Sequence, residues 1–162
     1  MNLEGILHQL VEEKKFRKLR GILEEMNEVD IAEFIQDMEL EKVVLVFRLL
    51  PKELGAEVFA CLEIEMQEYI INSMSDYELQ KIIEELYIDD AVDMLEELPA
   101  TVVRRVLANA KPDTRALINQ FLQYPDDSAG SIMTAEYIAL KKNMTVEQSF
   151  AYIRRNAVDK ET

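Results

Sequence analysis

Two stretches of the chain, "LLPKELGAEVFACL" (49–62) and "ELPATVVRRVLANA" (97–110), share one pattern at an offset of 48 residues. In each, a proline precedes a short amphipathic segment, and proline is well tolerated in the first turn of a helix. Short helices in a loose repeat cannot bury their apolar faces alone and are expected to stack on one another. The pattern therefore predicts an all-α fold, a superhelical stack of short helices (α-solenoid), with a plain helical bundle as the alternative. The matched residues are Pro51 with Pro99, Val58 with Val106, and Ala60 with Ala108.

Similar amphipathic segments recur from the amino terminus to about residue 125. A first helix is expected from Ile6 through Leu23, with one apolar and one basic side. Shorter helices follow, bounded by the aspartate, serine and proline residues that commonly start or stop helices. They are expected near residues 30–36, 41–50, 52–62, 65–73, 76–86, 89–98, 100–109 and 113–123.

The pattern changes after Tyr124. Residues 136–140 resemble a strand, and Thr145 with Gln148 forms a capping-box sequence that predicts the start of another helix. One strand and one helix cannot form a core. We therefore expect two parts: a helical domain over 1–125, and over 126–162 a partial α/β unit.

The charge distribution limits the classes of partner. The net charge is −14, and residues 21–100 alone carry 22 acids and four bases, a net −18. Such a surface repels nucleic acid and anionic lipid and attracts cations, so no nucleic-acid partner is expected. The longest apolar run, 43–47, is far too short to span a bilayer, so no membrane insertion of this chain is expected.

The residues that most enzyme sites need are scarce. His8 and Cys61 are the single histidine and cysteine, and the four glycines are scattered, which argues against zinc sites, Cys–His nucleophiles and phosphate loops. We therefore expect no enzyme. The lone cysteine is consistent with a reducing cytoplasm.

The densest acidic segment is "YIDDAVDMLEELP" (87–99), which contains no lysine or arginine. On a helical wheel Asp89 and Asp93 share the outer side, four residues and about 5–6 Å apart at their β-carbons. Clustered carboxylates without neighbouring bases suit hard divalent cations such as Mg²⁺ or Ca²⁺. The residues alone do not separate these two ions, and a solvated acidic face stays the alternative.

Two segments resemble the cytosolic part of MgtE-type magnesium transporters: "EELYIDDAVDMLEELP" (84–99) and "YPDDSAGSIMTAEYIALKKNMTVEQSFAYIRR" (124–155). The resemblance implies an N-terminal helical domain followed by the opening strand and helix of a first CBS domain. It also implies that CBS and transmembrane domains of the full-length chain are partners. That full-length protein would be a homodimer, with this part on the cytoplasmic side of the cell membrane.

By the same resemblance, the domain is a magnesium sensor in which interdomain Mg²⁺ favours the closed state of a channel. Its metal ligands carry over by motif to Asp89, Asp93 and, in an A-E-V segment, Glu57. A Gly-Gly pair of the family reads Gly130-Ser131 here, so no ligand is assigned there. Two alternatives stay open: a helical-repeat protein-interaction scaffold without ion sensing, and a CBS-type nucleotide site that includes residues 145–150.

Overall fold

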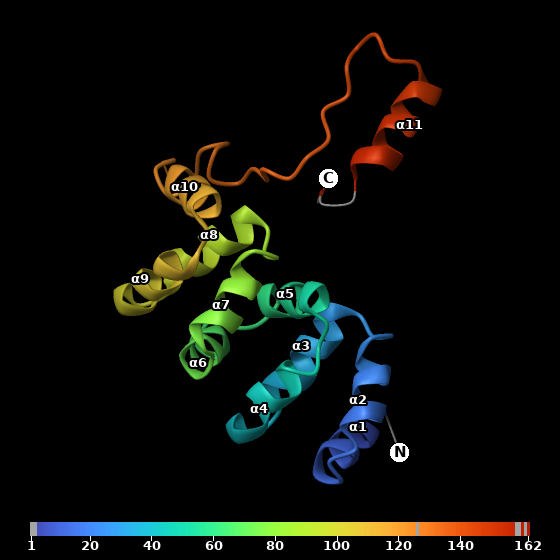
Figure 1. Cartoon of the computed structure of the whole chain (residues 1–162), viewed down its shortest axis with the longest axis vertical. Helices are drawn as coiled ribbons and strands as arrows, with labels where there is room; N and C mark the ends of the chain where they lie inside the picture. Colours follow the sequence, from blue (N-terminus) through green and yellow to red (C-terminus); the bar gives the residue numbers. More distant parts are fainter. Residues whose placement is uncertain (1–2, 126, 158–159, 161) are drawn as a thin grey trace. The chain divides into compact units, whose positions relative to one another are not determined.

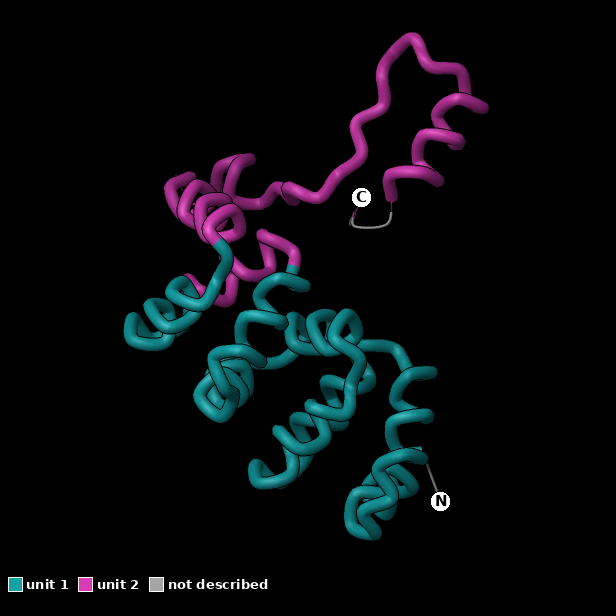
Figure 2. The backbone as a smooth tube through the Cα atoms, viewed as in Figure 1, with its two compact units in different colours: residues 1–86, 97–111 teal, residues 87–96, 112–162 magenta. Residues whose placement is uncertain are grey.

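The structure, a computed structural model, describes residues 3–125, 127–157, 160 and 162 (Figure 1). In these residues it contains eleven α-helices and no strand. The chain divides into two compact units (Figure 2): unit 1 holds residues 1–86 and 97–111, and unit 2 holds residues 87–96 and 112–162. Among the described helices none is long and apolar enough to cross a membrane. The predicted all-α class is confirmed, whereas the division at residue 125 stays a prediction.

Unit 1 is a stack of short helices, each packed mainly on near neighbours. Helix α3 packs on α5, α5 on α7, and α7 on α9, while α4 contacts α3 and α6. This nearest-neighbour packing is the arrangement expected of a helical repeat. Its helices are α1 (Leu3–Glu12), α2 (Phe16–Leu23), α3 (Glu28–Gln36), α4 (Leu40–Phe47), α5 (Lys52–Ala60), α6 (Ile64–Ser73), α7 (Asp76–Ile83) and α9 (Ala100–Asn109).

The repeat that predicted the stack reappears in helices α5 and α9. Each follows a proline in the N-cap position, Pro51 or Pro99. The matched residues Val58 and Val106 are both fully buried. The repeat is therefore a packing repeat: it places the same kind of side chain into the core from two helices of unit 1.

The predicted first helix is wrong in its length, because two helices occupy that segment. The first of them, α1, ends at Glu12. Lys14, two residues later, has a positive φ of 53°, which prevents the helix from continuing. The amides of Lys15 and Lys14 donate to the carbonyls of Leu10 (2.9 Å) and Val11 (3.0 Å). These two bonds form a Schellman motif, which satisfies carbonyls left open at a helix end. Because lysine usually avoids this conformation, the break could not be predicted from the residues of this segment.

Unit 2 contains the other three helices, α8 (Ile88–Glu97, of which Glu97 belongs to unit 1), α10 (Pro112–Phe121) and α11 (Val146–Asn156). The predicted capping box is confirmed at α11: the Thr145 hydroxyl accepts from the Gln148 amide, and the Gln148 side chain accepts from the Thr145 amide. Helix α11 itself has no buried residue.

The strand predicted at 136–140 is not present as a strand. The Ile138 amide donates to the Thr162 carbonyl (2.8 Å), and the Thr162 amide donates to the Glu136 carbonyl (3.3 Å). These two bonds are those of a single parallel pairing around Tyr137. One pairing does not make a ladder, so the predicted strand is reduced to an extended segment. The assignment of 126–162 to a CBS domain stays a prediction.

Candidate functional site

Two of the three predicted metal ligands, Asp89 and Asp93, lie on α8 in unit 2. Asp89 and Asp90 occupy the first turn of the helix, where the helix dipole favours a carboxylate. Asp93 follows one turn later, so its β-carbon is about 5–6 Å from that of Asp89. The structure therefore places these two carboxylates next to each other along one helix.

The two aspartates differ in exposure, which corrects the prediction of one shared outer face. Asp93 is exposed, whereas Asp89 is half-buried with its Oδ1 atom enclosed by protein. Helix α8 buries a wider set of side chains than the wheel assumed, because Ile88 and Val92 join the apolar face. Asp89 is three residues from Val92, about 60° around the helix, so it lies at the border of that face. Of the two, Asp93 is the more accessible to an ion.

Helix α8 itself carries carboxylates on its outer side and contains no lysine or arginine. Asp93, Glu96 and Glu97 are all exposed. None of the three takes part in a salt bridge with any lysine or arginine that the structure describes. These side chains are therefore accessible to a cation from solution.

The third predicted ligand, Glu57, lies on α5 in unit 1 and not on the helix of the other two. It is exposed, between the buried residues Ala56 and Val58. Within the described parts of the chain, no group of three or more histidine, cysteine, aspartate or glutamate side chains is arranged to hold a metal ion. Neither Glu57 on α5 nor the aspartate pair on α8 is by itself a set of three ligands, so each would need further ligands to hold an ion.

The segment after α10 shows a packing role for two residues of the "YPDDSAGSIMT" motif. A β-carbon at Gly130 would lie 2.6 Å from ring carbons of Tyr124. The Tyr124 ring in turn packs edge-on against Phe121, with the ring centroids 5.7 Å apart. Any side chain at position 130 would displace this ring. The spacing of tyrosine and glycine in the motif therefore has a structural reason, which the sequence alone did not show.

A second acidic feature, in unit 1, was missed by reasoning from the sequence. Carboxylates of α3 and one of α1 rim an apolar hollow of about 340 Å³. The signal was present as acids at positions 30, 33 and 37, a spacing that places them along one side of a helix. The apolar floor depends on residues distant in sequence, so the acids alone did not reveal it.

A model of the family described as "MgtE intracellular N domain" matches residues 26–127, more than half of the chain. The chain belongs to the MgtE family. It is 36% identical over 160 residues to the magnesium transporter MgtE of Thermus thermophilus, and 21% identical over 145 residues to that of Bacillus subtilis. These alignments cover 96% and 90% of this chain but 35% and 32% of the relatives. The chain thus spans about a third of the curated relatives' length.

Solved structures agree with this assignment. The chain matches the cytosolic domain of the Mg²⁺ channel MgtE in complex with ATP, with a TM-score of 0.84 and 35% identity. That match covers 99% of this chain and 66% of the other. The soluble part of a magnesium transporter shares the fold, with a TM-score of 0.86 at 22% identity over 98% and 63% of the two chains. The MgtE relatives are transporters rather than enzymes, which agrees with the predicted lack of catalysis.

Proposed function

We propose that this chain is the cytosolic, magnesium-sensing regulatory part of a magnesium transporter. The observation that carries the proposal is the acidic, base-free outer side of α8 in a member of the MgtE family. An interaction scaffold would have no need of carboxylates that lower helix stability. Like charges four residues apart destabilise an isolated helix by a few tenths of a kcal/mol.

In the proposed mechanism Mg²⁺ binds Asp93 and Asp89 on one side and carboxylates of the CBS domains on the other. Magnesium keeps several waters and uses one or two protein carboxylates, so an incomplete ligand set on each surface is sufficient. Without the ion, two acidic surfaces repel and the domains separate. With it, the closed arrangement is favoured because it binds Mg²⁺ more tightly than the open one.

Glu57 contributes a second ion position under this proposal. It is exposed on a segment of net negative charge, and Glu53 lies one turn before it on the same helix. A tenfold preference of each ion for the closed state is worth about 1.4 kcal/mol, so two or more ions give a steep response to magnesium. The full-length protein would be a homodimer, with its transmembrane domains forming the channel.

Residues 126–162 are proposed to open the first CBS domain. The parallel pairing around Tyr137 supports this, because parallel strands joined through a helix are the elements of an α/β unit. Three large apolar side chains of α11 are exposed: Val146 (74%), Phe150 (55%) and Tyr152 (41%). A helix of this kind normally packs its apolar side against a sheet.

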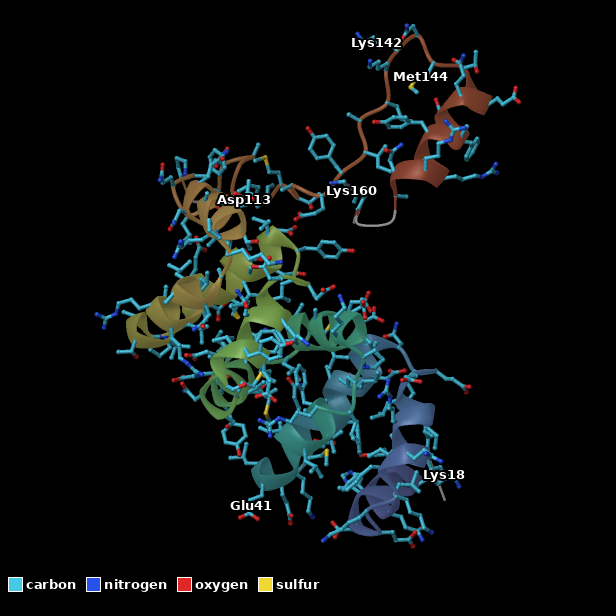
Figure 3. All side chains as sticks on the ribbon, viewed as in Figure 1. Lys18, Glu41, Asp113, Lys142, Met144 and Lys160 are labelled. Atoms are coloured by element: carbon cyan, nitrogen blue, oxygen red, sulfur yellow. The ribbon has the colours of Figure 1, made fainter. Side chains whose placement is uncertain are left out.

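The test uses the full-length transporter. Protease protection of the linker between the N and CBS domains is followed against Mg²⁺ concentration. Asp89→Asn with Asp93→Asn is expected to shift the protection curve to about tenfold higher Mg²⁺, the effect of weakening one ion site. The matched control is Glu41→Gln with Glu65→Gln, two exposed acids that form no salt bridge within the described part of the chain. Glu41 lies at the start of α4 (Figure 3).

The control is expected to leave the curve unchanged. An unshifted curve for the aspartate variant would identify α8 as a solvated face and favour the interaction scaffold. Equal shifts for both variants would mean that magnesium responds to net charge rather than to these ligands.

Nucleotide binding is a second candidate, favoured by the ATP complex of the structural relative. Here residues 126–162 would supply part of the site. Calorimetry of the full-length protein with ATP, at fixed Mg²⁺, tests it. Saturable heat that is absent from this 162-residue chain would mean that the site also needs residues of the full-length protein outside this chain.

A further inference from the structure

The hollow on unit 1 is lined mainly by residues of α1 and α3 and has an apolar floor. Leu7 and Phe34 form its base and are almost fully buried, at 1% and 4% exposure. Leu3 and Met26 complete the apolar lining. A volume of about 340 Å³ lies at the lower end of the range typical of small-molecule sites.

Four carboxylates, of Glu4, Asp30, Glu33 and Asp37, surround this floor. The last three are exposed and lie along one side of α3, over about 10 Å of helix axis. None of these three pairs with a lysine or arginine among the residues that the structure describes. Neighbouring members of the row are about 5–6 Å apart at their β-carbons.

We propose that this hollow binds an aliphatic polyammonium ion, such as a polyamine. Its methylene groups would contact Leu3 and Met26, the accessible part of the apolar lining, and its ammonium groups would pair with the carboxylates of α3. Both features are needed to select this ligand class. A hydrated metal ion gains nothing from an apolar floor, an anion is repelled by the rim, and a neutral apolar molecule would desolvate the carboxylates without pairing them.

This site is separate from α8 and extends the function beyond magnesium sensing. A ligand of this size, at the efficiency of ordinary small ligands, is expected to bind with a Kd of about 1 mM. Binding at that level would make unit 1 responsive to organic cations as well as to magnesium.

The test is a titration of the ¹⁵N-labelled chain with spermidine at constant ionic strength, followed by amide chemical shifts. Saturable shifts are expected in α1 and α3. Glu33→Gln with Asp37→Asn is expected to raise the Kd about three- to tenfold, the effect of losing two exposed ion pairs. Leu3→Ser, a change at an exposed position of the lining, is expected to raise it about twofold. The control pair Glu41→Gln with Glu65→Gln is expected to leave the Kd unchanged.

Several results would overturn the proposal. Shifts spread over all acidic helices would indicate a nonspecific ion atmosphere. An equal Kd for the α3 variant and the control would show that the carboxylates of α3 do not contribute to binding. The same shifts with MgCl₂ would assign the hollow to divalent ions, and a basic amphipathic peptide that binds where spermidine does not would assign it to a protein partner.

Discussion

Replacing Arg105 by alanine is expected to destabilise unit 1 by about 2–3 kcal/mol. From α9 its guanidinium donates to the carbonyls of Ile71 and Met74, both at 2.6 Å. It also pairs with Oδ1 of Asp76, at 2.9 and 3.1 Å. One side chain thus joins α9 to the end of α6 and to the start of α7.

Most of the expected loss of stability comes from the hydrogen bonds that Arg105 donates to the two carbonyls. A hydrogen bond from a charged donor contributes about 1.5–3 kcal/mol. Without Arg105 the Met74 carbonyl also loses its donor, at a cost of about 1–3 kcal/mol, whereas the Ile71 carbonyl still accepts from the Met74 amide at 3.3 Å. The Arg105 side chain is 29% exposed, so water replaces part of this loss. The ion pair adds less than about 1 kcal/mol, because the Asp76 side chain is 68% exposed.

Urea unfolding followed by circular dichroism measures the change. Arg104→Ala is the matched control, since Arg104 is exposed on the same helix and its Nε donates within α9, to the Ala100 carbonyl at 3.3 Å. It is expected to cost less than about 0.5 kcal/mol. Asp76→Asn, which removes the ion pair alone, is expected to cost about 1 kcal/mol or less. The explanation is wrong if Arg105→Ala costs no more than Arg104→Ala.

Three further changes test other contacts. Hydrogen bonds from the Arg48 guanidinium and from the amide and hydroxyl of Ser75 together lower the pKa of Glu78 from its ordinary 4.5 to about 2. Because the folded pKa is the lower one, the wild type should be about 1 kcal/mol more stable than Glu78→Gln above pH 4.5, an advantage lost toward pH 2 in acid-unfolding curves. Lys14→Gly should raise the free energy of unfolding by about 0.5–1 kcal/mol in urea, because glycine adopts a positive φ without strain; no gain would contradict the Schellman motif. Gly130→Ala should displace the Tyr124 ring, seen as changed ring resonances by NMR, at a cost of about 1–2 kcal/mol; unchanged resonances would contradict the close contact.

The amino-acid sequence by itself determined the helical class and most helix positions. Pro51 and Pro99 each mark the start of a helix, and the apolar residues that follow each proline recur at helical spacing. Both signals are local, so a single helix can be predicted from its own residues. The capping box at Thr145 was predictable for the same reason. So was the exposed position of Asp93, which needs only the helical period and its polar neighbours.

Whatever depends on residues distant in the chain was decided by the tertiary structure. Arg105 occupies the same position in the repeat as Glu57. Arg105 is half-buried and donates to a carbonyl of another helix, whereas Glu57 is exposed. Asp89 lies at the border of the apolar face of α8, and the extent to which such a border residue is buried depends on the elements that pack against it. The carboxylates of α3 surround a hollow only because Leu7 of α1 lies beneath them. The physical reason is the same in each case: hydrophobic period and capping are properties of a segment, whereas burial and pairing are properties of the neighbours that folding brings to it.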